Sequence, residues 1–139
     1  MITEYSAVNM AEAKVDPKWD GMPGDSVVER TASALRGRGF AVVVVGAASA
    51  ALGAVKEIIP AGAEVMNGSS TTLNEVGFGE FLKSGSHGWV NLHGAMLAEK
   101  DAVRQAELRR KAVSADYFVS GVNAITEAGD LVAVDATGS

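Results

Sequence analysis

The feature that most constrains the fold is an unbroken apolar run, Phe40–Val45, in which apolar and polar residues do not alternate. A run of β-branched residues without alternation is typical of a parallel strand that is covered on both faces. The residues that follow, Ala47–Ile59, predict a helix that ends at Pro60. The apolar stretch from Phe40 to Val55 is shorter than the roughly 20 residues that a membrane span needs. We therefore expect a buried strand followed by a helix.

Two helices carry a start signal, a serine or threonine followed three residues later by glutamate. In such a capping box each side chain satisfies a free backbone N–H group. The pair Ser26 and Glu29 predicts one helix start, and the pair Thr72 and Glu75 predicts another. The second helix runs to Leu82 and is expected to break near its two glycines.

The rest of the chain continues the alternation of strands and helices. The glycine-rich segment Lys83–Met96, which holds both histidines, is expected to be a loop. Alternating strands and helices imply βαβ units with right-handed crossovers. The expected fold class is therefore α/β, with a mostly parallel sheet and helices on both faces. The other expected elements are the strand Ala63–Met66, the helix Lys100–Ser114, the short strands Tyr117–Ser120, Asn123–Thr126 and Leu131–Val134, and a turn at Glu127–Asp130.

Length and composition narrow the class of protein further. The 139 residues fit one domain, expected over residues 25–139 after an irregular N-terminal arm over residues 1–24. The chain has no cysteine, so it cannot bind an iron–sulfur cluster or zinc through thiolates of its own, and we expect no cofactor in this chain. A net charge of −5 argues against a nucleic-acid partner. Without a secretory signal or a membrane span, a cytoplasmic location is expected.

The main candidate for a ligand site is the polar loop Asn67–Thr72, which lies between a predicted strand end and a predicted helix start. Ligands of open α/β sheets bind at the carboxyl ends of the strands. Free N–H groups at a helix start attract phosphate or carboxylate, and Gly68 lets the backbone approach a ligand closely. The alternative is an ordinary polar turn with a helix cap. The loop is neither a Walker loop nor a dinucleotide-binding fingerprint. Its residues are Asn67, Gly68, Ser69, Ser70, Thr71 and Thr72.

Two further glycine loops follow predicted strands. Gly121 and Asn123 lie after the first, and Asp135 and Gly138 lie after the second. Loops at the same ends of neighbouring strands could converge on one pocket. Alternatively, Gly121 marks a β-bulge, and the loops are unrelated turns.

Titratable side chains give no complete catalytic arrangement. Glu75 could be a general base or only a capping residue, and Asp135 is a second candidate for a base or nucleophile. His87 and His93 fit no common metal-binding spacing, so no metal site is expected. Neither histidine has an identifiable orienting partner, and their roles stay open.

Taken together and in order, these segments resemble the LUD domain, the lactate-utilisation family that includes lactate utilisation protein C. The resemblance covers nearly everything from about Ser26 onward, and its last segment is the most specific. The segments that carry it are Val28–Phe40, Ile59–Leu73, Glu75–Gly77 and Ala115–Gly138.

The resemblance implies a fold like that of ribose-phosphate isomerases, glucosamine-phosphate deaminases and coenzyme A transferases. In those proteins, glycine and hydroxyl loops at strand ends hold a phosphate or an acyl group. The implied function is binding of a small anionic metabolite beside iron–sulfur oxidoreductase partners that oxidise L-lactate to pyruvate. The alternatives are a stand-alone isomerase or acyl-transfer enzyme and a structural or regulatory module. The residues implied to surround the ligand are the loop from Gly68 to Thr72 together with Gly121, Asn123, Asp135 and Gly138.

Members of the family continue beyond the Thr-Gly pair with an arginine and further strands and helices, whereas this sequence stops at Ser139. We therefore expect either a truncated piece or a chain that another chain completes. An open sheet edge would favour association with other chains, so a homo-oligomer is a further expectation.

Overall fold

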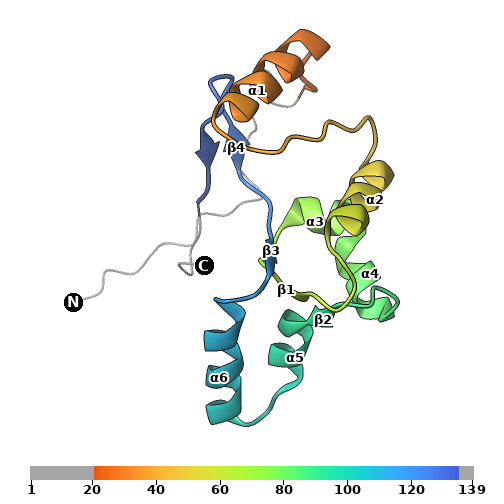
Figure 1. Ribbon diagram of the computed structural model, residues 1–139, viewed down its shortest axis with the longest axis vertical. Coiled ribbons are helices and arrows are strands. Elements are labelled where there is room, and N and C mark those ends of the chain that lie inside the picture. Colours follow the sequence, from red (N-terminus) through yellow and green to blue (C-terminus); the bar gives the residue numbers. More distant parts are fainter. Residues whose placement is uncertain (1–20, 135–139) are drawn as a thin grey trace, which may run out of the picture.

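The computed structural model of the protein describes residues 21–134 (Figure 1). The expected N-terminal arm therefore falls almost entirely outside the described residues. So do two of the expected ligand residues, Asp135 and Gly138. No helix within residues 21–134 combines the length and the apolar character needed to cross a membrane.

A small parallel sheet lies at the centre of the fold and confirms the α/β class. Strand β1 (Glu64–Asn67) is flanked by β2 (Val90–Asn91) and by β3 (Tyr117–Val119), in the order β2-β1-β3. Both pairings are parallel, with Val65 opposite Asn91 on one side and opposite Tyr117 on the other. The carboxyl ends of all three strands therefore lie at the same edge of the sheet.

The helices follow most of the expected boundaries. The expected break is confirmed between α3 (Thr71–Glu75) and α4 (Phe78–Ser84), because Gly77 adopts the left-handed conformation with φ of 80°. The last long helix is capped by Asp101, whose carboxylate accepts the Arg104 N–H at 2.9 Å. The helices are α1 (Asp25–Gly37), α2 (Ala48–Ile58), α3 (Thr71–Glu75), α4 (Phe78–Ser84), α5 (Leu92–Ala98) and α6 (Ala102–Ala112).

Both predicted capping boxes are wrong, because each N-cap lies two residues earlier than expected. The N-cap of α1 is Gly24, which makes no side-chain capping bond. The N-cap of α3 is Ser70, whose hydroxyl accepts the Leu73 N–H at 3.3 Å. With the helices starting earlier, Glu29 and Glu75 are no longer at the third helical position, so they cannot return a bond to the cap.

The glycine-rich segment Lys83–Met96 was expected to be a loop, and this is also wrong. It contains β2 and most of α5, because Val90 and Asn91 pair with β1. The Asn91 side chain then caps α5 by accepting the Gly94 N–H at 2.8 Å. Pairing with a strand distant in sequence outweighs the local preference of glycines for loops.

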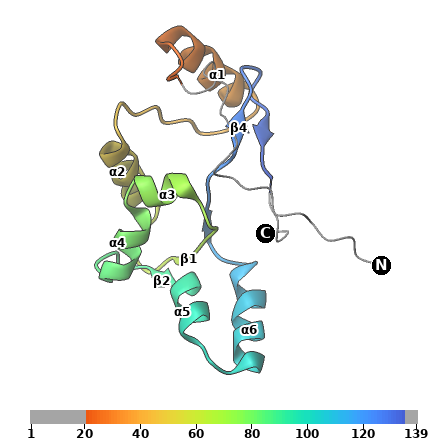
Figure 2. The same ribbon diagram turned by 180° about the vertical axis from the view of Figure 1, so that it is seen from behind.

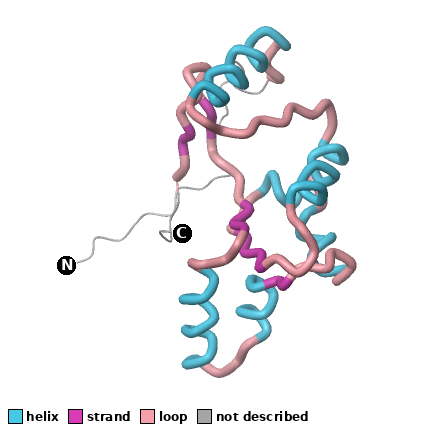
Figure 3. The backbone as a smooth tube through the Cα atoms, in the orientation of Figure 1, coloured by secondary structure: helices cyan, strands magenta, loops and turns pink. Residues whose placement is uncertain are grey.

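The apolar run Phe40–Val45 is not a strand. It crosses from α1 to α2 as an extended segment (Figure 3) and pairs with no strand among residues 21–134. The side chains of Phe40 and Val43 are 46% and 63% exposed. A β-branched composition favours a strand, but composition alone does not supply the hydrogen-bonded neighbour that a strand requires.

The core lies between the sheet and the helices α2, α3 and α4. Val65 of β1 and Phe78 of α4 are its most deeply buried side chains. Trp89 adds its indole ring, and its ring N–H donates to the Ile59 carbonyl at 3.1 Å. The remaining buried members of this cluster are Ile59, Ala63, Leu73 and Leu82.

An antiparallel hairpin stands apart from the sheet, and its turn is confirmed. Strands β4 (Ala124–Ile125) and β5 (Leu131–Val132) form the hairpin, which lies against α1 in both views (Figures 1 and 2). Arg30 pairs with Glu127 at 2.9 Å, and Arg38 pairs with Asp130 at 2.7 Å. Helix α1 is therefore attached to the turn of the hairpin.

Candidate functional site

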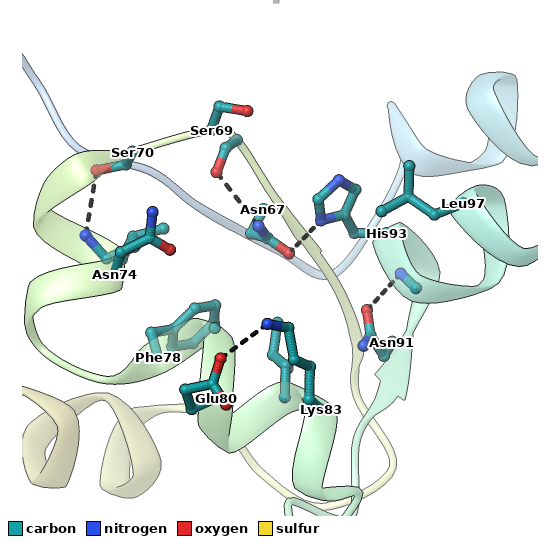
Figure 4. Close-up of a pocket in the computed structure, with 15 residues that line it drawn as sticks. Asn67, Ser69, Ser70, Asn74, Phe78, Glu80, Lys83, Asn91, His93 and Leu97 are labelled. Atoms are coloured by element: carbon teal, nitrogen blue, oxygen red, sulfur yellow. Dashed lines mark hydrogen bonds and ion pairs between the residues drawn. The ribbon is translucent and has the colours of Figure 1, made fainter.

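A cavity of about 510 Å³ opens at the carboxyl ends of β1 and β2 (Figure 4). Its walls are the loop between β1 and α3, helix α4, and the first turn of α5. Leu73, Phe78, Leu82 and Leu97 supply the apolar part of the lining. The polar part includes Asn67, Ser69, Ser70, Asn74, Asn91 and His93.

The structure divides the predicted loop into two parts. Residues Asn67 to Ser70 line the cavity, whereas Thr71 and Thr72 are exposed in the first turn of α3 and lie outside the lining. The Ser70 hydroxyl already accepts the Leu73 N–H as the helix cap. Of the four consecutive hydroxyl groups, Ser69 is therefore the one in the lining that has no capping role.

The second predicted loop touches the first, as proposed for converging strand ends. A Cβ added at Gly68 would lie 3.0 Å from the Ser120 hydroxyl. A Cβ added at Gly121 would overlap the Ser70 hydroxyl, closer than real Cβ atoms approach any heavy atom. Gly121 is thus outside the cavity lining but supports the residue that forms part of it.

Asn123 has a different position from the one expected. Its side-chain oxygen accepts the Val134 N–H at 2.7 Å, and its own N–H donates to the Val132 carbonyl at 2.9 Å. Both bonds hold the hairpin. Asn123 is not among the residues that line the cavity.

Glu75 is the candidate base within the described residues. Its side chain is exposed, at the last residue of α3, and it does not line the cavity. A general base needs to be within hydrogen-bond reach of the proton that it removes. The structure gives Glu75 neither this position nor the capping role.

His87 has both ring nitrogens engaged by the backbone. Its Nδ1 accepts the Trp89 N–H at 2.9 Å, and its Nε2 lies 3.2 Å from the Leu82 carbonyl. The ring is also stacked on the indole of Trp89. These contacts give His87 a structural role, in the turn between α4 and β2.

His93 is a cavity residue to which the sequence analysis assigned no role. It is the second residue of α5, lines the cavity, and places its Nδ1 3.0 Å from the side-chain oxygen of Asn67. Its position after β2 corresponds to that of the polar loop after β1. Because the segment Lys83–Met96 was predicted to be a loop, His93 was not recognised as a residue at the end of a strand.

Among the described residues, Lys83 is the one lysine or arginine that lines the cavity. Its ammonium group pairs with Glu80 at 2.7 Å, and the two side chains are 76% and 80% exposed. An ion pair in such an exposed place is weak, so an incoming anion can compete for Lys83. Within residues 21–134, no group of three or more acidic, histidine or cysteine side chains is placed to hold a metal ion.

The model of the LUD domain family matches residues 28–139 of the chain. The chain belongs to the LUD domain family. No curated protein and no solved structure gives a significant match. The LUD match contains every residue that lines the cavity, and membership points to a function related to lactate utilisation.

Proposed function

We propose that this LUD domain binds a small carboxylate metabolite, of the class of L-lactate and pyruvate, in the cavity at the ends of β1 and β2. The observation that carries the proposal is that the polar loop after β1, His93 and Lys83 line one cavity together with apolar side chains. Sites for small molecules are mostly apolar and hold a few placed polar groups, in cavities of about 300–1,000 Å³.

The chemistry of the lining suits a short carboxylate. The Lys83 ammonium and the Ser69 hydroxyl are donors for the carboxylate oxygens, and the exposed Leu97 offers apolar surface to a methyl group. Binding would exchange the exposed contact of Lys83 with Glu80 for one with the ligand. The cost of this exchange is small, because an exposed ion pair contributes only about 0–1 kcal/mol.

The domain would act beside iron–sulfur partner proteins in the oxidation of L-lactate to pyruvate, in the cytoplasm. Iron–sulfur clusters are held mainly by cysteine thiolates, and this chain contains no cysteine. The cluster would therefore belong to the partner, and this domain would supply binding and orientation of the metabolite.

We also propose that the fold is related to that of ribose-phosphate isomerases and coenzyme A transferases. The parallel strands with polar loops at their carboxyl ends support this relation. A shared fold does not fix the reaction. Glu75 lies outside the cavity, so the geometry favours the binding role over isomerisation by that residue.

Isothermal titration of the purified chain with L-lactate, pyruvate and ribose 5-phosphate tests the proposal. We expect at least one of the two carboxylates to bind. Lys83→Met should weaken that binding roughly 2- to 5-fold, the range of an exposed charge contact. Lys100→Met removes an exposed lysine outside the cavity and should leave the affinity unchanged. A folded sample that binds neither of the two carboxylates would disprove the binding role.

A further inference from the structure

The side-chain amide of Asn67 is held in one orientation by two contacts. Its nitrogen donates to the Gly68 carbonyl at 3.2 Å, and its oxygen faces the Nδ1 of His93 at 3.0 Å. The opposite orientation would bring the amide oxygen against the Gly68 carbonyl and leave two acceptors facing each other. The amide oxygen therefore accepts a hydrogen bond, and the proton must be on Nδ1 of His93.

This arrangement decides what His93 offers to the cavity. A neutral imidazole with its proton on Nδ1 has a lone pair on Nε2. Figure 4 shows the second ring nitrogen of His93 pointing away from Asn67, and the His93 side chain belongs to the lining of the cavity. No described residue forms a hydrogen bond with this nitrogen. His93 thus presents an unused acceptor at the wall of a half-open cavity.

We propose that Nε2 of His93 selects a ligand with a hydroxyl group on the carbon next to its carboxylate. The hydroxyl would donate to Nε2, whereas the carbonyl oxygen of a 2-oxo acid has no proton to donate and would face a lone pair. This inference rests on the proposed binding of a carboxylate in the same cavity. In it, Asn67 is a positioning residue, because it acts on the ligand only through the proton of His93.

Neither charged side chain of the lining is suited to accept a hydrogen bond from the hydroxyl group of the ligand. Lys83 can only donate, and it suits the carboxylate. Glu80 can accept, but it is paired with Lys83 and 80% exposed. The serine hydroxyls of the lining can accept but can also turn to donate. Discrimination between a hydroxyl and a carbonyl requires an acceptor that cannot become a donor, and the neutral ring of His93 with its proton on Nδ1 meets this requirement.

His87 provides an internal reference, because the structure predicts the opposite tautomer for it. Its Nδ1 accepts the Trp89 N–H, so its proton is on Nε2 and points to the Leu82 carbonyl. The two histidines are the only ones in the chain. A two-bond proton–nitrogen correlation spectrum at about pH 8.5, where an imidazole is ordinarily neutral, should therefore contain one ring of each tautomer.

The spectrum is assigned with His87→Gln and His93→Gln, each of which removes one ring. We expect the Nδ1–H pattern for His93, and we expect Asn67→Leu to remove the preference for it while the His87 pattern stays unchanged. An Nε2–H pattern for His93 in the wild-type chain would overturn the proposal, because the cavity would then contain a donor. This measurement requires no ligand, so it is independent of the proposed binding role.

The second measurement compares the affinities for L-lactate and pyruvate at the same pH. We expect the wild-type chain to favour L-lactate roughly 10-fold, the effect of one hydrogen bond gained against one acceptor left unpaired. His93→Phe keeps a ring of similar size, and Asn67→Leu keeps His93 itself, and both should bring the ratio close to one. Equal wild-type affinities would overturn this inference alone. Absence of binding to either acid would overturn the binding role and this inference with it.

Discussion

At the scale of single residues, Gly121 has no room for a side chain, since a Cβ there would overlap the Ser70 hydroxyl. Ser70 caps α3 and lines the cavity, so the contact links the second loop to the site. A residue outside the cavity can therefore affect the position of one that lines it.

We predict that Gly121→Ala lowers the free energy of unfolding by about 1–3 kcal/mol, the usual cost of inserting a methyl group without space. Ligand affinity should fall as well, because Ser70 must move. Urea unfolding and titration calorimetry measure the two effects. Gly46→Ala is the control, since nothing lies within 4 Å of a Cβ at that position. Equal effects of the two substitutions would show that the loops do not press on each other.

The site was only partly predictable from individual residues. The polar composition of Asn67–Ser70 between a strand and a helix was enough to single out that loop, while its role as a ligand site stays a prediction. His93 could not be recognised in the same way. Its partner Asn67 is 26 positions away, and only the parallel pairing of β1 with β2 brings them together.

At the scale of elements, a local signal predicted the break between two helices, whereas a strand depends on a distant partner. Gly77 acts on its own neighbours, and the break between α3 and α4 appears in the structure as expected. The run Phe40–Val45 has the composition of a strand but finds no partner. A strand forms only where its backbone pairs with another strand, and within residues 21–134 no strand pairs with this run. Sequence composition alone does not contain that information.

Helix α2 gives a test of how open its surroundings are. Gly53 lies in its middle, and a Cβ there would meet nothing within 4 Å. Because glycine costs a helix interior about 0.5–1 kcal/mol relative to alanine, Gly53→Ala should raise the free energy of unfolding by that amount. Thermal melting at a low, fixed protein concentration measures it. A lower melting temperature would mean that the space beside α2 is filled.

At the scale of the whole molecule, apolar side chains remain exposed on several elements. They belong to the extended segment before α2, to β3 and to the hairpin. An extended segment with an unpaired backbone is a template for pairing with another chain, and apolar patches mark sites of association. The exposed residues include Phe40, Val43, Val44, Phe118, Ile125 and Leu131.

We therefore predict that the chain self-associates or is only marginally stable on its own. Light scattering and thermal melting over a concentration series should show a mass or a transition temperature that rises with concentration. Val44→Lys adds a charge to the extended segment and should reduce association, whereas Ser33→Lys adds the same charge to the exposed part of α1. A monomer with a sharp transition at high temperature, independent of concentration, would contradict this prediction.

The attachment of α1 to the hairpin also has a consequence during protein synthesis. Arg30 and Glu127 are 97 positions apart, so the helix leaves the ribosome long before its partner has been translated. In that interval Leu35, which is buried in the finished structure and lies beside Gly129 of the hairpin turn, lacks this neighbour. A segment that is synthesised before its packing partner can misfold or bind a chaperone in the meantime. Helix α1 of this LUD domain is therefore synthesised early but completes its packing late.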